Sequence, residues 1–311
     1  MTKRRADLLL LAATFTWGVS FVIVKRALAD SSPLAFLSIR FALATLALSP
    51  FVKLRGGWSS AELRAGAVLA VLLASGFACQ VVGLQYTTPA RSAFIVALSS
   101  VLAPVFGLLL LRHRAGWMVV LALAIAGVGI YFLTAPDAGG LNRGDLWTMI
   151  TAVVFGGHIV AVAELSRRYD PLRLVWLQIA GTAVGVGLFA AIFESIRLLW
   201  SPALIGAIVF TGLMATAIAL VWQMRAQAHM SSARASLIFC LEPMFAAMTS
   251  WFFWGEELSR SQGLGALLIL GGMVLAQYRF APHSRVAQLV EQPAVNRRVA
   301  GSSPASGASS R

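Results

Sequence analysis

Apolar residues follow one another along the chain in runs of about 20, divided by short polar segments. A helix of this length crosses the hydrocarbon core of a bilayer, whereas a transmembrane β-strand would show shorter segments of alternating apolar and polar residues. The pattern therefore predicts an all-α membrane protein. We expect ten transmembrane helices, at residues 7–28, 33–52, 65–86, 90–111, 116–134, 146–166, 171–193, 202–224, 233–254 and 262–280.

The composition agrees with this fold class. Of the 311 residues, 59% are hydrophobic and 12% are charged, whereas soluble domains carry about 25% charged residues. The net charge of +13 would also suit a nucleic-acid-binding protein, but the basic residues stand singly or in short clusters between apolar runs. We therefore expect the lipid bilayer, and no nucleic acid, as a partner. Cys79 and Cys240 both fall within apolar runs and predict neither a disulfide nor a metal site.

The positions of Lys and Arg predict the orientation of the chain in the membrane. The connections between apolar runs are short, so neighbouring helices are antiparallel. Most of the basic residues then lie on the side of the N-terminus, which places both termini in the cytoplasm by the positive-inside rule. Residues 283–311 are rich in Ser, Ala and Gly, and we expect them to form a disordered basic tail.

The chain contains an internal repeat. Three segments of the first half match the second half without gaps, the first two at a spacing of 138 residues and the third at 143: WGVSF (17–21) with FGGHI (155–159), PLAFLSIR (33–40) with PLRLVWLQ (171–178), and CQVVGLQYTTPAR (79–91) with WQMRAQAHMSSAR (222–234). The repeats are expected at 1–140 and 141–282, with five helices each. Because five is odd, the second repeat enters the membrane inverted. Inverted repeats are typical of transporters that bind substrate near the bilayer midplane.

Several of these stretches resemble a known family. WGVSF, SIRFALA, GLQYTT and CLEPMFAAMTSWFFWGEELS are similar, in their order and spacing, to segments of the drug/metabolite transporter superfamily. Within it, residues 7–280 resemble the ten-helix exporters with two EamA-type repeats, and most closely the bacterial aromatic amino acid exporters. The resemblance implies an exporter of the bacterial inner membrane whose central cavity is lined by helices of both halves. One departure is RHRAGW (112–117), which lacks the glutamate of WGEELS.

Three polar residues within the apolar runs are candidates for gating or coupling. Arg40 and its repeat-mate Gln178 place a polar group at the same depth in both halves. Arg40 could contact a substrate carboxylate or act in gating; alternatively it is a structural arginine bonded to backbone carbonyls or to Glu242, or directed to the membrane surface. Glu242, just before Pro243, must be protonated or paired at this depth. It could couple proton movement to export, or pair with an arginine.

A second set of residues predicts a substrate site. Trp17 and Ser20 share one face of a helix, and so do their repeat-mates Phe155 and His158. Such aromatic and polar faces suit a flat amphipathic ligand, although a lone intramembrane histidine can also be a hydrogen-bonded interior group. The remaining candidates are Gln80 and its repeat-mate Gln223, which could orient an amino acid or join helices, and Tyr86, which could line an outer gate or belong to an aromatic belt.

The sequence therefore predicts a secondary-type transporter that exports small metabolites by alternating access. Aromatic or other bulky apolar amino acids are the first choice, and other amphipathic metabolites, drugs or an uncoupled facilitator or channel remain as alternatives. No nucleotide-binding motif and no cofactor are expected. His158 has no second histidine or aspartate at its depth, so an intramembrane enzyme is not expected. The oligomeric state is left open, and a monomer is compatible with the sequence.

Overall fold

A computed structural model describes residues 2–52, 57–110, 117–134, 140–230 and 232–278. Ten helical segments run through these residues, and eight of them are long and apolar enough to cross a membrane, with two shorter apolar helices at Val120–Leu133 and Arg260–Ala276. The expected fold class is confirmed. The tail at 283–311 lies outside the described residues.

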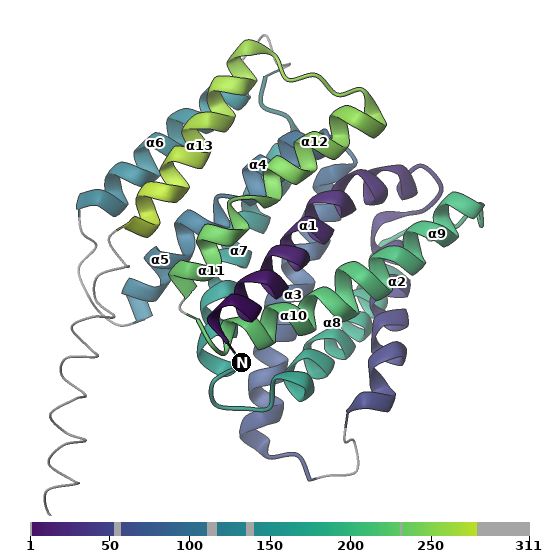
Figure 1. Cartoon of the computed structure of the whole chain (residues 1–311). Coiled ribbons are helices and arrows are strands. Elements are labelled where there is room, and N and C mark those ends of the chain that lie inside the picture. The colour runs from purple at the N-terminus through teal and green to yellow at the C-terminus, as the bar shows by residue number, and fades with distance from the viewer. Residues whose placement is uncertain (1, 53–56, 111–116, 135–139, 231, 279–311) are drawn as a thin grey trace, which may run out of the picture.

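Seven of the ten segments are single helices, and three are interrupted (Figure 1). The uninterrupted ones are α1 (Lys3–Ala27), α2 (Pro33–Leu48, continued by the 3-10 turn Ser49–Phe51), α3 (Ser60–Leu84), α6 (Trp117–Leu133), α7 (Arg143–Leu165), α8 (Pro171–Phe193) and α13 (Arg260–Tyr278). The interrupted ones are α4 (Pro89–Val96) with α5 (Ser99–Leu110), α9 (Pro202–Phe210) with η3 (Thr211–Ile218) and α10 (Ala219–Gln227), and α11 (Ser232–Phe239) with α12 (Glu242–Trp254).

Two of the interruptions correct the expected continuous helices at 90–111 and 233–254. The fourth helix breaks at residues 97–98 and the ninth at 240–241, so the two breaks are related by the repeat spacing of 143. Pro243 follows the second break and has no N–H to donate to the carbonyl of Phe239. Inside a bilayer, such breaks are tolerated where the freed backbone is buried in protein or lines a cavity.

The third interruption is the π-helical segment η3 in the eighth helix. Its wider turn is held by a hydrogen bond from Thr216 Oγ1 to the carbonyl of Thr211 at 2.8 Å. The carbonyl of Ala215 in the same segment accepts a hydrogen bond from Trp17 Nε1 at 2.8 Å. Single π-helical turns occur frequently at functional sites. Here the segment is attached to α1 of the other repeat.

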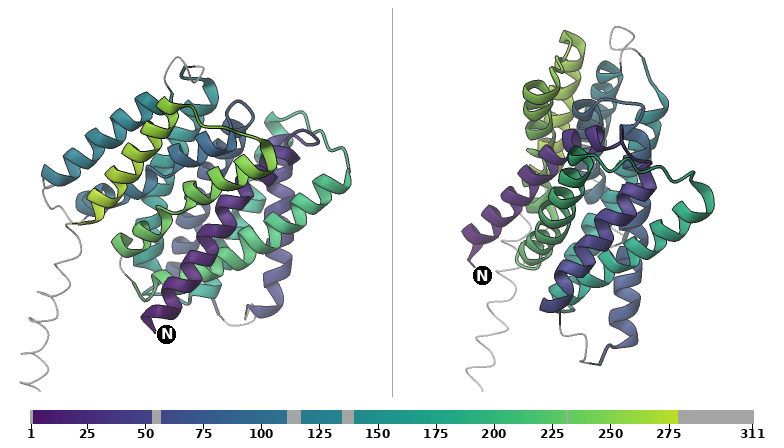
Figure 2. Two further views of the ribbon diagram at one scale, coloured as in Figure 1. Left: turned by 45° about the horizontal axis from the view of Figure 1, so that its top comes forward. Right: turned by 90° about the vertical axis from the view of Figure 1, so that its right-hand side faces the viewer.

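The two repeats interlock instead of forming separate bodies. α3 of the first repeat packs against α7 and α8 of the second, and α10 with η3 packs in the equivalent way against α1 and α2. α6 and α13 lie side by side at one edge of the molecule (Figure 1), and the views of Figure 2 agree. Their close crossing depends on glycine, because a Cβ atom at Gly265 would lie 2.6 Å from the carbonyl oxygen of Gly129.

The bundle has two ends, which we call the N-terminal end and the opposite end. The N-terminal end holds the start of α1 and the connection between α10 and α11, where Arg234 binds Asp7. The opposite end holds the start of α7 and the connection between α3 and α4, where Lys25 Nζ donates to the carbonyls of Leu84, Gln85 and Thr87 at 2.8–3.1 Å. Large apolar side chains such as Val184 and Met248 stay exposed along the helices between the ends, as a lipid-facing surface requires.

Candidate functional site

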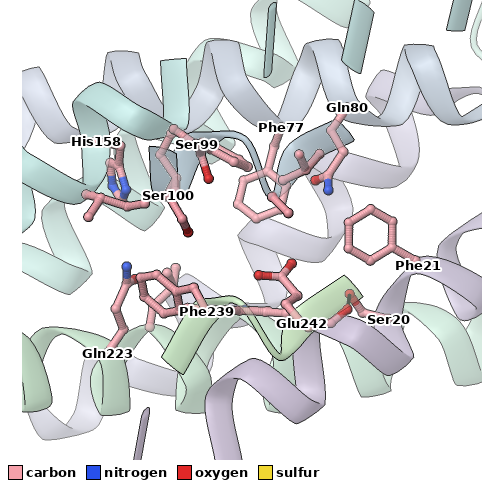
Figure 3. Close-up of a pocket in the computed structure, with 17 residues that line it drawn as sticks. Ser20, Phe21, Phe77, Gln80, Ser99, Ser100, His158, Gln223, Phe239 and Glu242 are labelled. Carbon is pink, nitrogen blue, oxygen red and sulfur yellow. Dashed lines mark hydrogen bonds between the residues drawn. The ribbon is translucent and has the colours of Figure 1, made fainter. Parts of the chain in front are cut away.

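A cavity of about 70 Å³ lies between the repeats, beside the breaks of the fourth and ninth helices (Figure 3). This volume holds on the order of five water molecules. The wall contains the side chains of Trp17, Ser20, Phe21, Leu73, Phe77, Gln80, Val96, Ala97, Ser99, Ser100, Phe155, His158, Ile159, Leu220, Gln223, Phe239 and Glu242.

The cavity wall follows the symmetry of the repeat. Of the 17 lining residues, fourteen form seven pairs of repeat-mates. At a spacing of 138 the pairs are Trp17 with Phe155, Ser20 with His158, and Phe21 with Ile159; at 143 they are Phe77 with Leu220, Gln80 with Gln223, Val96 with Phe239, and Ser99 with Glu242. Both halves therefore contribute equivalent positions to one central space, as a symmetry axis through the cavity requires.

Seven of the residues singled out in the sequence line this cavity: Trp17, Ser20, Gln80, Phe155, His158, Gln223 and Glu242. The indole of Trp17 is fixed by its hydrogen bond to Ala215 and by the ring of Phe239, whose centroid lies 5.9 Å away. Ser20 donates to the carbonyl of Trp17 in its own helix at 2.7 Å. The Trp17 indole is thus held in place by contacts with two other helical segments.

His158 and Gln178 act as a pair. His158 Nε2 lies 3.0 Å from Oε1 of Gln178, and both side chains are buried. Gln178 does not line the cavity but stands behind His158 and fixes the orientation of its ring. Gln178 Nε2 has no hydrogen-bond partner among the described residues.

Arg40 occupies the equivalent place behind Ser20. Its side chain is 1% exposed, and its Nε donates to Thr216 Oγ1 at 2.7 Å. The partner is therefore a hydroxyl of η3. The bonds to backbone carbonyls or Glu242, which were one alternative for Arg40, are not found among the described residues. The guanidinium lies 4.9 Å from the ring centroid of Phe77. Arg40 Nη2 has no hydrogen-bond partner in the described part of the chain, and Arg40 lines a small cavity of about 10 Å³ together with Ser20 and Gln80.

Glu242 brings an acidic group to the wall. It is the first residue of α12, directly after the helix break, and its carboxylate points into the cavity in Figure 3. The start of a helix favours negative charge there. No hydrogen bond or ion pair connects Glu242 to another described residue, so the alternative of pairing with an arginine is not seen in this conformation.

Tyr86 lies outside the central cavity. Its side chain is 56% exposed at the opposite end, where it borders a separate hollow with Lys25, Arg91 and Gln262. In contrast, Phe21, Phe77, Ser99, Ser100 and Phe239 line the cavity without having been singled out. Extending the repeat spacing of 143 through the fourth and ninth helices would have paired Ser99 with Glu242.

Comparisons with known proteins identify the family. Residues 4–135 and 142–278 each match the EamA-like transporter family, so the two matches span most of the chain. The chain belongs to the EamA-like transporter family. It is therefore a multi-pass membrane transporter and not an enzyme.

Relatives of this EamA-like transporter are similar over most of their length. An uncharacterized transporter of Archaeoglobus fulgidus is 32% identical over 274 residues, covering 88% of this chain and 86% of the relative. The uncharacterized transporter YvbV of Bacillus subtilis is 29% identical over 286 residues, covering 88% and 92%. A solved crystal structure with 18% sequence identity and a TM-score of 0.65 covers 88% of this chain and 97% of its own, which supports the fold alone.

Proposed function

We propose that this EamA-like transporter exports small amphipathic metabolites by alternating access, with aromatic or other bulky apolar amino acids as the first candidates. The observation that carries the proposal is the central cavity, where paired positions of both repeats contribute aromatic side chains and polar groups to one wall. Such a site combines an apolar surface for a ring with a few placed polar groups for orientation.

The aromatic residues provide the surface for the substrate's ring. Trp17, Phe77, Phe155 and Phe239 meet around the cavity, and Phe77 and Phe155 pack edge to face with their centroids 5.2 Å apart. Burying an aromatic side chain against such a wall is worth on the order of 2 kcal/mol. This moderate gain suits an exporter, because it must release substrate on the far side of the membrane.

The polar groups would hold the charged ends of an amino acid. Glu242, which has no partner among the described residues, offers its carboxylate to the ammonium group, while Gln80 and Gln223 offer amides to either end. Arg40 Nη2, which has no hydrogen-bond partner in the part of the chain that the structure describes, lies behind Ser20 and Gln80, and it can bind a carboxylate that reaches the small cavity. In this arrangement Arg40 lies behind Ser20 and Gln178 behind His158, and both support the site without lining the central cavity.

Glu242 also explains how export could be driven without ATP. A carboxylate that binds either a proton or the substrate's ammonium group, but not both, exchanges one for the other in each transport cycle. With the N-terminal end in the bacterial cytoplasm, as the basic residues favour, proton entry would then drive metabolite exit. The alternatives are an uncoupled facilitator, and export of cationic amphipathic drugs, which the aromatic wall and lone carboxylate would also accept.

The test is efflux from proteoliposomes that contain the purified transporter. We expect saturable efflux of phenylalanine and tryptophan that accelerates under an inward proton gradient, and accelerated counterflow from external substrate. The variant Glu242→Gln keeps the shape of the side chain and should abolish the effect of the gradient. Unsaturable efflux would indicate a channel, and transport of tetraphenylphosphonium without either amino acid would assign the cationic-drug alternative.

A further inference from the structure

Three ion pairs among the described residues connect the repeats: Arg173 with Glu62 at 3.3 Å, and two pairs of equal geometry, one at each end of the bundle. At the opposite end, Arg91 Nε donates to Asp145 Oδ1 at 2.9 Å, and Nη2 binds Oδ2. At the N-terminal end, Arg234 Nε donates to Asp7 Oδ1 at 2.8 Å, and Nη2 donates to Oδ2 at 2.5 Å. Both are therefore two-pronged contacts in which the same guanidinium nitrogens meet the same carboxylate oxygens.

The two pairs are copies of one interaction. Asp7 and Asp145 stand at the repeat spacing of 138, and Arg91 and Arg234 at that of 143. In each pair the arginine belongs to one repeat and the aspartate to the other. Because the repeats are inverted, the copies lie at opposite ends of the bundle, and each joins the start of the fourth helix of one repeat to the first helix of the other.

The copies differ in their surroundings. The side chains of Arg91 and Asp145 are 4% and 0% exposed, whereas those of Arg234 and Asp7 are 45% and 32% exposed. Asp145 additionally accepts hydrogen bonds from Thr87 Oγ1 and from the backbone N–H of Asn142, both at 2.9 Å. One copy is thus enclosed in a hydrogen-bonded network, and the other is open to water.

The helices that carry the two arginines also differ in burial: α4, with Arg91, is more buried than α11, with Arg234. Every residue of α4, from Pro89 to Val96, is buried. In α11, the equivalent helix, Arg234 and Leu237 are exposed. At the opposite end α3 and α7 also approach so closely that a Cβ atom at Gly144 would lie 2.4 Å from the carbonyl oxygen of Gly83. The opposite end is therefore the more tightly closed of the two.

We propose that these ion pairs are the two gates of alternating access, and that the two conformations exchange their environments. In the conformation described, the Arg91–Asp145 gate is buried and shut, and the Asp7–Arg234 gate is hydrated. In the alternate conformation the Asp7–Arg234 gate is buried and the Arg91–Asp145 gate admits water. The inference rests on alternating access in the proposed function, but not on the substrate.

The physical reason lies in how much an ion pair depends on burial. Removing one partner of a buried pair leaves an uncompensated charge and strongly destabilises the state that buries it. An exposed pair contributes little to the state in which it is exposed. Each gate therefore biases mainly the conformation in which it is closed. Having one gate of identical chemistry at each end keeps the two conformations close in free energy, so that a substrate can shift their populations.

The test follows a cysteine in the cavity wall with a membrane-impermeant maleimide. Cys79 and Cys240 are replaced by alanine, and Ala97→Cys is introduced as the reporter. Labelling is measured in membrane vesicles of both orientations, without substrate. We expect faster labelling from the N-terminal end in this background. Arg91→Gln should raise labelling from the opposite end by about tenfold or more. Asp7→Asn weakens the gate that is closed in the alternate conformation, so it should lower labelling from the opposite end by roughly two- to fivefold.

A charge reversal is the matched control. Asp7→Arg combined with Arg234→Asp restores an ion pair with exchanged partners, so labelling should return toward the background. Because Arg91→Gln leaves Asp145 buried without its partner and can impair folding, the double variant Arg91→Met with Asp145→Leu serves as a second control. It leaves no unpaired charge at the buried gate, so labelling from the opposite end should stay at the background level or fall below it. Gel filtration reports the folded fraction. If Arg91→Gln and Asp7→Asn changed labelling from the opposite end in the same direction, or did not change it, the proposal would be overturned.

The outcome separates this inference from the proposed substrate. If the labelling shifts are opposite as expected but no amino acid is transported, the gates stand and the substrate assignment fails. If phenylalanine is transported and the labelling shifts are absent, the gate assignment fails and the substrate stands.

Discussion

The contact between Gly83 and Gly144 offers a direct way to hold the opposite end apart. In the substitution Gly144→Ala, the new Cβ would lie 2.4 Å from the carbonyl oxygen of Gly83 and 2.9 Å from the backbone nitrogen of Thr87. Both are backbone atoms, so neither can rotate away. Restoring ordinary contact of 3.4 Å or more requires α3 and α7 to separate by about 1 Å.

The free-energy cost follows from this overlap. Overpacking of this kind typically costs about 1–3 kcal/mol, and the helix preference of alanine over glycine returns up to about 1 kcal/mol. A net penalty of about 1–2 kcal/mol against the conformation closed at the opposite end shifts the two conformations by about 5- to 30-fold. We therefore expect Gly144→Ala to raise maleimide labelling of Ala97→Cys from the opposite end by that factor.

Gly185→Ala in α8 is the matched control. A Cβ at Gly185 meets no atom of the described residues within 4 Å, so only the favourable helix preference remains. Labelling should match the unsubstituted protein, and its melting temperature in detergent should be equal or higher. Equal labelling of the two alanine variants would refute the argument that this glycine contact seals the opposite end.

Three further predictions concern the central cavity. Trp17→Phe keeps an aromatic wall but leaves the carbonyl of Ala215 without its donor, so we expect the unfolding free energy to fall by about 1–3 kcal/mol in a detergent melt; an unchanged melt would contradict this. Trp17→Ala and His158→Ala should reduce phenylalanine efflux from proteoliposomes while the folded amount stays high, and normal rates for both would remove them from the site. Gln178→Leu should reduce efflux about as much as His158→Ala because it frees the imidazole, whereas Gln178→Glu keeps an acceptor and should retain more activity than Gln178→Leu.

The sequence determined the architecture because local length and repetition set it. Runs of about 20 apolar residues can only be placed as helices across a bilayer, and the spacings of 138 and 143 fixed the two repeats. The same spacings, with helical periodicity, were enough to bring Trp17, Ser20 and His158 to one predicted surface. Each of these inferences needs only neighbours within a turn of helix or an equivalent position in the other repeat.

Only the tertiary structure decided where the helices break, which partners the buried polar side chains bind and which end of the bundle is closed. The helix breaks at 97–98 and 240–241 depend on the cavity that accepts their backbone, and Arg40 binds Thr216, which lies 176 residues away. In the sequence Asp7 and Asp145 are charged residues near helix ends, and no pattern of neighbouring residues connects them to Arg234 and Arg91. Their pairing, and the burial of one pair but not the other, depends on how two interlocked repeats pack, because burial is a property of the whole fold and not of any single segment.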